Sequence, residues 1–147
     1  MQIIEGNILD ITEGIICHQV NCQGVFNAGL AKQIRKKYVK VFREYMSHSL
    51  GAGWQLGECQ LIQVSDSLFI SNLAGQDDYG NNGYCYTNYS YLKHSIEQVK
   101  ALNDSNEQIY FPYGMGCGLA GGDWNIVSQI INEVVPNAII VKLSRQN

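Results

Sequence analysis

The sequence lacks the features that would place it in a membrane or a secretory route. No apolar run approaches the roughly 20 residues that span a bilayer. Met1 leads directly into the strand-like QIIEG without the pattern of a signal peptide. No internal repeat and no low-complexity segment is visible. We therefore expect a cytoplasmic protein with no membrane partner.

The chain also lacks an excess of positive charge. Its net charge is −3, and 16% of its 147 residues are charged. A general nucleic-acid binder usually carries a basic field, so the composition counts against that class of protein. Hydrophobic residues make up 46% of the sequence, which is ordinary for a globular protein. The length and composition predict one domain, 1–147, with a real core.

No pair of cysteines has the close C-x-x-C spacing of zinc sites. The five cysteines, at positions 17, 22, 59, 85 and 117, are also odd in number, which does not favour a disulfide framework. We expect reduced thiols, with Cys17 and Cys117 as small core residues. A metal site made by His18 and Cys22 is a weaker alternative, because His18 lies in a buried-looking strand and is expected to be a core histidine. Neither a metal nor a cofactor is predicted.

Glycine is abundant in one stretch, Ile109 to Trp124, which reads IYFPYGMGCGLAGGDW. An apolar run leads into five glycines at 114, 116, 118, 121 and 122, and Asp123 follows as a helix N-cap. The next residues place Val127, Ile130, Ile131 and Val134 on one helical face. Glycines let backbone N–H groups approach a phosphate, and a helix N-terminus favours an anion. The stretch therefore predicts a strand, an anion-binding loop and a helix.

The remaining patterns predict strands that alternate with helices. We expect strands at Gln2–Glu5, Ile15–Asn21, Glu58–Val64, Leu68–Leu73, the run at Ile109 and Ala138–Leu143, and helices at 29–45, 89–102 and after Asp123. The strands at 58–64 and 68–73 form a hairpin. Residues Ala74 to Asn88 form a polar loop that is long enough to be a lid or a binding element. This order predicts an α/β fold with a mixed sheet covered on both faces.

The predicted helix from Gly29 to Tyr45 is the most basic part of the chain. Its inner stripe is expected to be Leu30, Ile34, Tyr38, Val41 and Tyr45. The basic residues that fall mainly on the other faces, with few aromatic residues among them, are Lys32, Arg35, Lys36, Lys37 and Lys40. A solvated helix face is therefore favoured over a nucleic-acid patch.

Two loops follow strands and lead into helices, at Cys22–Gly29 and Tyr113–Gly122. If their strands are parallel neighbours, both loops lie at the carboxyl ends of the sheet, where they suit a diphosphate. The run Gly116–Gly121 matches the dinucleotide-binding pattern G-x-G-x-x-G, but only one more strand follows it, which disfavours that fold. A P-loop is disfavoured because the loop contains no Gly-Lys-Ser/Thr.

Three segments resemble the macrodomain family, over the full chain and in the right order. They are Gly6-Asn7-Ile8-Leu9, then Gln19 to Gly24 with Asn27 to Ala31, and Gly116 to Trp124. The sequence is most similar to the branch that holds ADP-ribose-1″-phosphate processing proteins and ADP-ribosyl hydrolases acting on protein acyl esters or DNA. The resemblance implies a three-layer α/β/α fold, with a mixed, mostly parallel sheet of about six strands and ADP-ribose in a cleft over it.

The resemblance also implies which residues contact the ligand. Asn7 and Ile8 would flank the adenine, and Asn21 would face the distal ribose. Backbone N–H groups would hold the diphosphate at Gly24, Ala28, Gly29, Leu30, Ala31, Gly114, Met115, Gly116, Cys117, Gly118 and Leu119. The residues themselves predict a diphosphate site but do not name adenine or ribose.

The sequence departs from this branch at positions that matter for catalysis. Its hydrolases rely on a lysine shortly after the fourth strand, and some use an acid in the second glycine loop. This chain has no lysine between Ser71 and Gln76, and Ala120 stands at the acidic position. If the chain is catalytic, we expect a water held by Asn21, Gln76 or Asp77 to attack at the distal ribose or its phosphate.

Each of these residues also has a simpler role open to it. Asn21 would merely cap a turn, and tyrosines of the 74–88 loop would pin that loop rather than close over a ligand. A Cys117 nucleophile is a weaker alternative, because no histidine is demonstrably beside it.

Three functions remain open from the sequence. The first is an enzyme that processes an ADP-ribose derivative, either by removing a 1″-phosphate or by cleaving an ADP-ribosyl linkage. The second is a reader or sequestering module for ADP-ribose-type nucleotides without turnover. The third is a nucleic-acid-associated domain whose helix 29–45 lies on phosphates, with ADP-ribosylated DNA or RNA as its substrate.

Overall fold

A central sheet organises the computed structural model, which describes residues 1–144. Its strands are β1 (Gln2–Glu5), β2 (Gly14–Val20), β3 (Cys59–Gln63), β4 (Leu68–Ala74), β5 (Ile109–Pro112) and β6 (Ile139–Lys142). They lie in the order β1-β6-β5-β2-β4-β3, and every neighbouring pair is parallel except the β3–β4 hairpin. The predicted mixed, mostly parallel sheet is confirmed.

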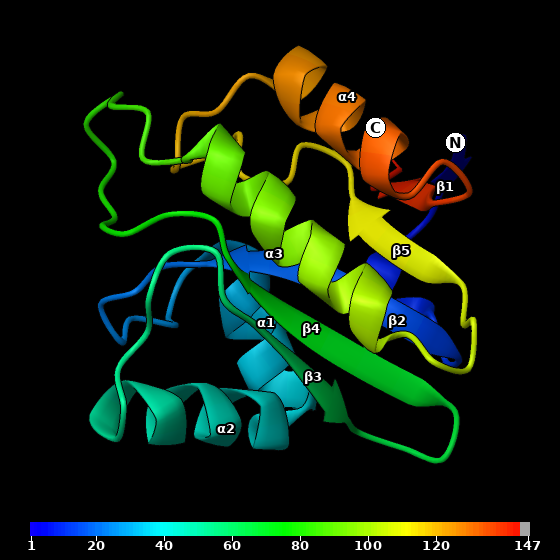
Figure 1. Ribbon diagram of the computed structural model, residues 1–147, viewed down its shortest axis with the longest axis horizontal. Coiled ribbons are helices and arrows are strands. Elements are labelled where there is room, and N and C mark those ends of the chain that lie inside the picture. The colour runs from blue at the N-terminus through cyan, green and yellow to red at the C-terminus, as the bar shows by residue number, and fades with distance from the viewer. Residues whose placement is uncertain (145–147) are drawn as a thin grey trace.

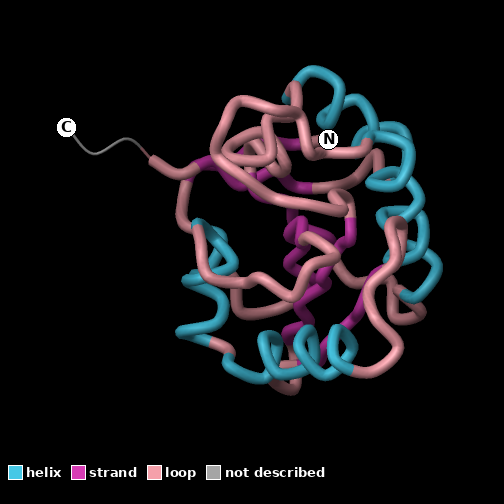
Figure 2. The backbone as a smooth tube through the Cα atoms, turned by 90° about the vertical axis from the view of Figure 1, so that its left-hand side faces the viewer, coloured by secondary structure: helices cyan, strands magenta, loops and turns pink. Residues whose placement is uncertain are grey.

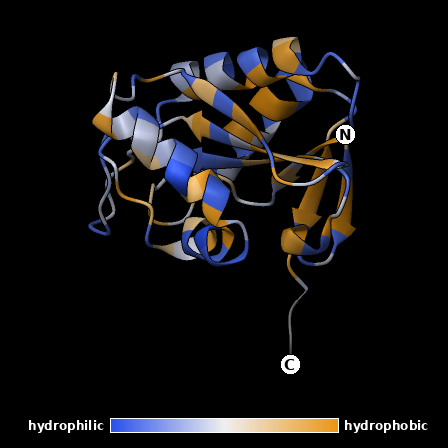
Figure 3. Cartoon of the chain, turned by 90° about the horizontal axis from the view of Figure 1, so that it is seen from below, coloured by the Kyte–Doolittle hydropathy of each residue, from blue (hydrophilic) through white to orange (hydrophobic). Residues whose placement is uncertain are grey.

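Helices cover both faces of the sheet. They are the short 3-10 helix η1 (Ile8–Asp10) and the α-helices α1 (Gly29–Lys37), α2 (Val39–Leu50), α3 (Tyr89–Leu102) and α4 (Trp124–Val134). Helices α1 and α2 pack on one face, where Ile34 and Tyr45 are buried, and α3 and α4 pack on the other, where Ile96 and Ile131 are buried (Figure 1). Figure 3 shows helices with apolar and polar residues on opposite sides. The three-layer α/β/α architecture is therefore as expected.

Strand β2 is buried on both faces, as its apolar run predicts. Ile15 and Cys17 belong to the core beneath α3 and α4, whereas Ile16 and Val20 belong to the core beneath α1 and α2. This alternation is the two-residue period of a strand. It fixes the strand between two packed layers and leaves only its carboxyl end open to a ligand.

The prediction of one helix from Gly29 to Tyr45 is wrong, because the chain breaks at Tyr38. Tyr38 has φ −131° and ψ 74°, outside the helical region, and is both the C-cap of α1 and the N-cap of α2. The break lets α2 take its own direction while it buries Val41 and Tyr45 against the sheet. No glycine or proline marks the break, and the apolar period continues through it, so the local pattern gave no signal.

The 74–88 loop is closed at its base rather than free. Gln76 and Thr87 form an isolated antiparallel bridge, and the Asn88 N–H donates to the Gly75 carbonyl at 2.7 Å. Just before Thr87, the Tyr86 N–H donates to the Ala120 carbonyl at 2.7 Å. The loop is therefore fixed against the glycine stretch. None of the helices formed by residues 1–144 has both the length and the apolar character needed to cross a membrane.

Candidate functional site

Strands β2 and β5 are parallel neighbours, so the loops that follow them emerge at the same end of the sheet. Figure 2 looks onto this end. The two loops and part of the 74–88 loop line a cleft of about 580 Å³. This is a typical size for a small-molecule site. The predicted meeting of the two loops at one edge of the sheet is confirmed.

One wall of the cleft is the N-terminus of α1, which has no side-chain cap. Ala28 occupies the N-cap position with extended backbone, φ −136° and ψ 155°. Within residues 1–144, the N–H groups of Gly29, Leu30 and Ala31 donate to no protein acceptor. Unpaired donors in the first turn of a helix, together with the helix dipole, favour an anion.

The opposite wall is the glycine loop after β5. Gly114 and Gly116 have φ +78° and +74°, a conformation that glycine adopts without strain. Internal hydrogen bonds hold the loop, including Cys117 N–H to the Gly114 carbonyl and Gly122 N–H to the Gly116 carbonyl, both at 2.9 Å. In the described part of the chain, the N–H groups of Gly118 and Leu119 find no acceptor. Two walls of unpaired backbone donors thus line one cleft.

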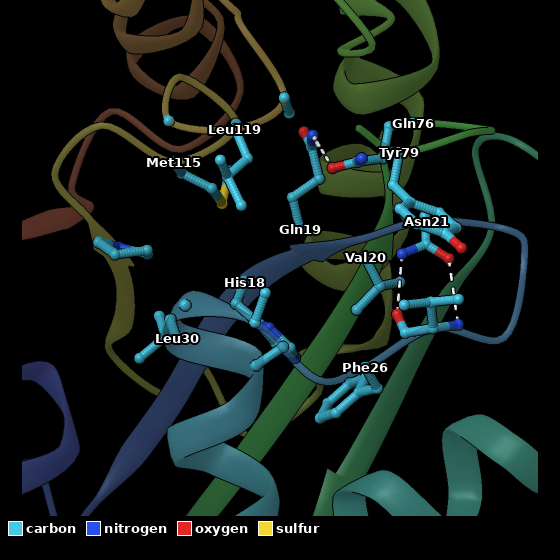
Figure 4. A pocket seen from close by; sticks show the side chains of 18 of the residues that line it. His18, Gln19, Val20, Asn21, Phe26, Leu30, Gln76, Tyr79, Met115 and Leu119 are labelled. Carbon is cyan, nitrogen blue, oxygen red and sulfur yellow. Dashed lines mark hydrogen bonds between the residues drawn. The ribbon is translucent and has the colours of Figure 1, made fainter. Parts of the chain in front are cut away.

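Most of the predicted site residues lie in this cleft. The lining includes Asn21, Ala28, Gly29, Leu30, Ala31, Gln76, Gly114, Met115, Gly116, Gly118 and Leu119 (Figure 4). Asn7, Ile8, Gly24, Asp77 and Cys117 are not part of it. Each of these five residues has another contact that explains its position.

The proposed adenine contacts belong to the turn after β1. Asn7 caps η1, and its Oδ1 accepts a hydrogen bond from the Leu9 N–H at 2.9 Å. Ile8 is buried in the core beneath α1 and α2. Strand β1 is at the edge of the sheet, and β6 and β5 separate it from β2.

Gly24 and Asp77 support the wall of the cleft from behind. The Gly24 N–H donates to the Tyr45 hydroxyl at 3.2 Å, and a Cβ on Gly24 would lie 2.8 Å from Ser49 Oγ. The Asp77 carbonyl accepts from the Cys22 N–H at 2.9 Å. The backbone contact at Asp77 joins the 74–88 loop to the loop after β2.

Cys117 points its sulfur into its own loop. The thiol donates to the Met115 carbonyl at 3.3 Å. Burial, with smaller effects of Asp123 and Cys85, raises the pKa of Cys117 to about 11. A thiol with that pKa is protonated near pH 7, which does not favour the nucleophile hypothesis.

The Asn21 side chain holds the turn after β2 by hydrogen bonds, a common role for an asparagine at the end of a strand. Its Oδ1 accepts from the Gln23 N–H at 2.9 Å and from the Tyr45 hydroxyl at 3.0 Å. Its Nδ2 donates to the Val25 carbonyl at 2.8 Å (Figure 4). One Nδ2 hydrogen remains, so toward a ligand Asn21 offers a donor rather than a base.

A polar network at the cleft was not predicted; it joins Gln19, which lines the cleft, to Thr87 behind it. Gln19 Nε2 donates to Gln76 Oε1 and to Thr87 Oγ1, both at 2.9 Å. The Thr87 hydroxyl donates to the Gly116 carbonyl at 2.6 Å. The network ties β2, the 74–88 loop and the glycine loop together. The only available signal in the sequence was a glutamine at the carboxyl end of an otherwise apolar strand.

The cleft holds no charged side chain among its described lining residues. Its one histidine, His18, is 2% exposed, and burial lowers its pKa to about 4, so the ring is neutral near pH 7. Within residues 1–144, no three His, Cys, Asp or Glu side chains are grouped to hold a metal ion. The cleft can therefore hold an anion by backbone dipoles, but it offers little acid–base chemistry of its own.

No protein-family model matches the sequence, and no curated protein matches it. Among solved structures, a Bacteroides thetaiotaomicron protein of unknown function is 25% identical, with a TM-score of 0.87 over 97% of each chain. A macrodomain protein from Streptomyces coelicolor is 18% identical, with a TM-score of 0.79 over 99% of each chain. The chain has the macrodomain fold.

The same macrodomain fold occurs within a larger protein. Thermosipho africanus DarTG, solved in complex with ADP-ribose, is 14% identical, with a TM-score of 0.78. The match covers 99% of this chain and 43% of that one. At this identity the likeness establishes the macrodomain fold and leaves function to the site.

Proposed function

We propose that residues 1–147 form a single macrodomain that binds ADP-ribose or a derivative of it. The observation that carries this proposal is the pair of backbone donor walls, at 28–31 and 114–119, on either side of one cleft. Two such walls suit two linked phosphates. The ADP-ribose complex of Thermosipho africanus DarTG, which has this fold, supports the choice of nucleotide.

A reader or sequestering module is the role that the cleft favours. Its described lining has no acid, lysine or arginine, and His18 is neutral near pH 7. General acid–base catalysis needs a group whose pKa lies near the working pH and that reaches the reacting atoms. Binding needs only the backbone donors and a shaped cleft, and both are present.

Processing of a derivative is the second candidate function, since Asn21 and Gln76 line the cleft. The free Nδ2 hydrogen of Asn21 is able to hold a ribose hydroxyl or a water. The activity would be removal of a 1″-phosphate or cleavage of an ADP-ribosyl linkage on protein or nucleic acid. In either reaction a phosphate of the ligand would supply the negative charge that the cleft lacks.

Nucleic acid as a direct ligand of the basic helical face is disfavoured by the contacts that three of the cations on this face make with the protein. The ammonium groups of Lys37 and Lys40 donate to the carbonyls of Leu9 and Gln63. The Arg35 guanidinium lies 3.7 Å from the centre of the Phe42 ring. These groups are held against the protein rather than free to pair with phosphates.

Calorimetry with ADP-ribose tests the proposal, and one-to-one saturable binding is expected. Absence of heat and of any ligand-induced thermal stabilisation at high micromolar ADP-ribose would contradict it. Incubation with ADP-ribose-1″-phosphate, with ADP-ribosylated protein and with ADP-ribosylated DNA then separates the two roles. Release of phosphate or of ADP-ribose that grows with enzyme concentration identifies an enzyme, and binding without product identifies a reader.

A further inference from the structure

A row of side-chain hydrogen bonds crosses three strands of the sheet and ends in the cleft. Gln60 on β3, Asn72 on β4 and His18 on β2 are register partners. Gln60 Nε2 donates to the backbone carbonyl of Glu44 at 3.0 Å, and Gln60 Oε1 accepts from Asn72 Nδ2 at 2.9 Å. Asn72 Oδ1 contacts His18 Nε2. Asn72 and His18 are almost fully buried.

The direction of every hydrogen bond in this row follows from its first member. A backbone carbonyl only accepts, so the Gln60 atom that faces Glu44 must be the amide nitrogen. Gln60 Oε1 then faces Asn72, so Asn72 must donate to it from Nδ2. Asn72 Oδ1 is therefore the atom that faces His18. An oxygen acceptor requires a donor, so His18 carries its proton on Nε2. The tautomer is therefore assigned by the network, and Nδ1 keeps a bare lone pair.

The residue that carries this lone pair lines the cleft. Within residues 1–144, His18 Nδ1 has no hydrogen-bond partner, and the only partnerless buried side-chain atom that is sealed from solvent is Gln19 Oε1. His18 lines the cleft beside Leu30, and its ring packs edge-on against Phe26 at 5.4 Å (Figure 4). Nδ1 is thus an acceptor without a protein partner, on a residue in an apolar stretch of the cleft wall.

We infer that His18 Nδ1 accepts a hydrogen bond from a ribose hydroxyl of the bound nucleotide, an assignment that rests on the proposed function. A bare lone pair repels an unprotonated phosphate oxygen, so the partner must be a donor. The neighbouring Leu30 belongs to the first turn of α1, whose free N–H groups are suited to a phosphate. The group next to a phosphate in a nucleotide is a sugar. The hydroxyls of this sugar are donors, and they lie next to the phosphate that is placed at the start of α1.

The inference gives Gln60 a role at a distance from the ligand. Gln60 does not line the cleft, but its amide is what orients Asn72. Without it, the Asn72 amide is free to turn over and present Nδ2 to His18. His18 would then place its proton on Nδ1 and lose the acceptor. Gln60 is a positioning residue that sets the specificity of the cleft through a tautomer.

Nitrogen-15 NMR of histidine-labelled protein tests the assignment directly. The free protein is expected to show His18 as the Nε2–H tautomer, distinguished from His48 and His94 by a His18→Gln spectrum. Saturating ADP-ribose should move the Nδ1 resonance toward that of a hydrogen-bonded acceptor and leave Nε2 protonated. An Nδ1–H tautomer in the free protein overturns the inference. So does an unmoved Nδ1 resonance in protein that calorimetry shows to be saturated.

Two substitutions of Gln60 supply a matched pair. Gln60→Leu removes the acceptor for Asn72 and should produce a population of the Nδ1–H tautomer, with an affinity for ADP-ribose about three- to tenfold weaker. Gln60→Glu loses the donor to the Glu44 carbonyl but keeps an acceptor for Asn72 Nδ2, so it should preserve both the tautomer and the affinity. An unchanged tautomer or an unchanged affinity in Gln60→Leu contradicts the inference. Failure of the unaltered protein to bind ADP-ribose removes the proposed function and this inference with it.

Discussion

Buried polar side chains decide the chemistry of this cleft at the scale of single residues. His18 is kept neutral by burial, and Asn21 uses most of its hydrogen-bonding capacity on its own loop and on Tyr45 of α2. Cys117 is a protonated thiol bonded to a carbonyl. Each of them is held in place by the protein, so a ligand meets a preformed surface rather than mobile charged groups.

The neutral His18 predicts a pH dependence of stability. Its folded pKa, about 4, lies below the ordinary 6.5, so between these values the unfolded chain binds a proton that the folded protein does not. The free energy of unfolding should therefore fall as the pH drops from about 6.5 to about 4. Urea denaturation across this range measures the effect, with His18→Gln as the reference. Equal slopes for the two proteins would contradict the low pKa.

Asn21→Ala is expected to cost stability as well as ligand binding. The substitution leaves the Gln23 N–H, the Tyr45 hydroxyl and the Val25 carbonyl without their side-chain partner. Losses of about 1–3 kcal/mol are typical when buried groups lose a partner. Thermal denaturation measures this, with the exposed Asn27→Ala in the same loop as a control. A variant as stable as the parent would show that Asn21 serves the ligand alone.

At the scale of elements, the N-terminus of α1 and the glycine loop make the site. The glycine loop, its strand, and α4 with its Asp123 cap could be predicted, because turn chemistry and an apolar period lie close together in the sequence. The division of the predicted 29–45 helix into α1 and α2 could not. The helix breaks at Tyr38 because its two parts pack on the sheet, and no residue near Tyr38 in the sequence signals the break.

Ala28→Asp is predicted to act in opposite directions on stability and binding. A carboxylate at the N-cap of α1 would accept from the free first-turn N–H groups and raise stability by about 0.5–1.5 kcal/mol. It would also place negative charge where a phosphate is proposed, and weaken ADP-ribose binding about tenfold or more. Ala28→Asn is the uncharged control. It should stabilise the helix with a much smaller loss of affinity.

Thermal denaturation and calorimetry on the Ala28 variants give both quantities. Tighter binding by Ala28→Asp than by Ala28→Asn would mean that no anion lies at the start of α1.

Gly121 and Gly118 form a second matched pair, in the glycine loop. Gly121 has φ +72°, and an added Cβ would clash with the Tyr84 carbonyl oxygen. Gly121→Ala should therefore lower the free energy of unfolding by at least about 1 kcal/mol and loosen the contact with the 74–88 loop. Nothing lies within 4 Å of a Cβ on Gly118, so Gly118→Ala should fold with ordinary stability. Equal losses in the two variants would refute this difference.

At the scale of the whole molecule, the fold joins residues that are distant in the sequence. The two loops could be predicted to meet, because parallel neighbouring strands end together. The network of Gln19, Gln76 and Thr87 could not, nor could the row from Gln60 to His18. Both depend on strand register and loop closure, which no local pattern contains. The macrodomain fold thus supplies the cleft, and its contacts across the sheet determine which groups face it.

A structure determined with ADP-ribose bound tests the central claim most directly. The diphosphate is expected between the two walls, within hydrogen-bonding distance of backbone nitrogens from both 28–31 and 114–119. A nucleotide held by only one wall, or bound elsewhere on the protein, would contradict the account.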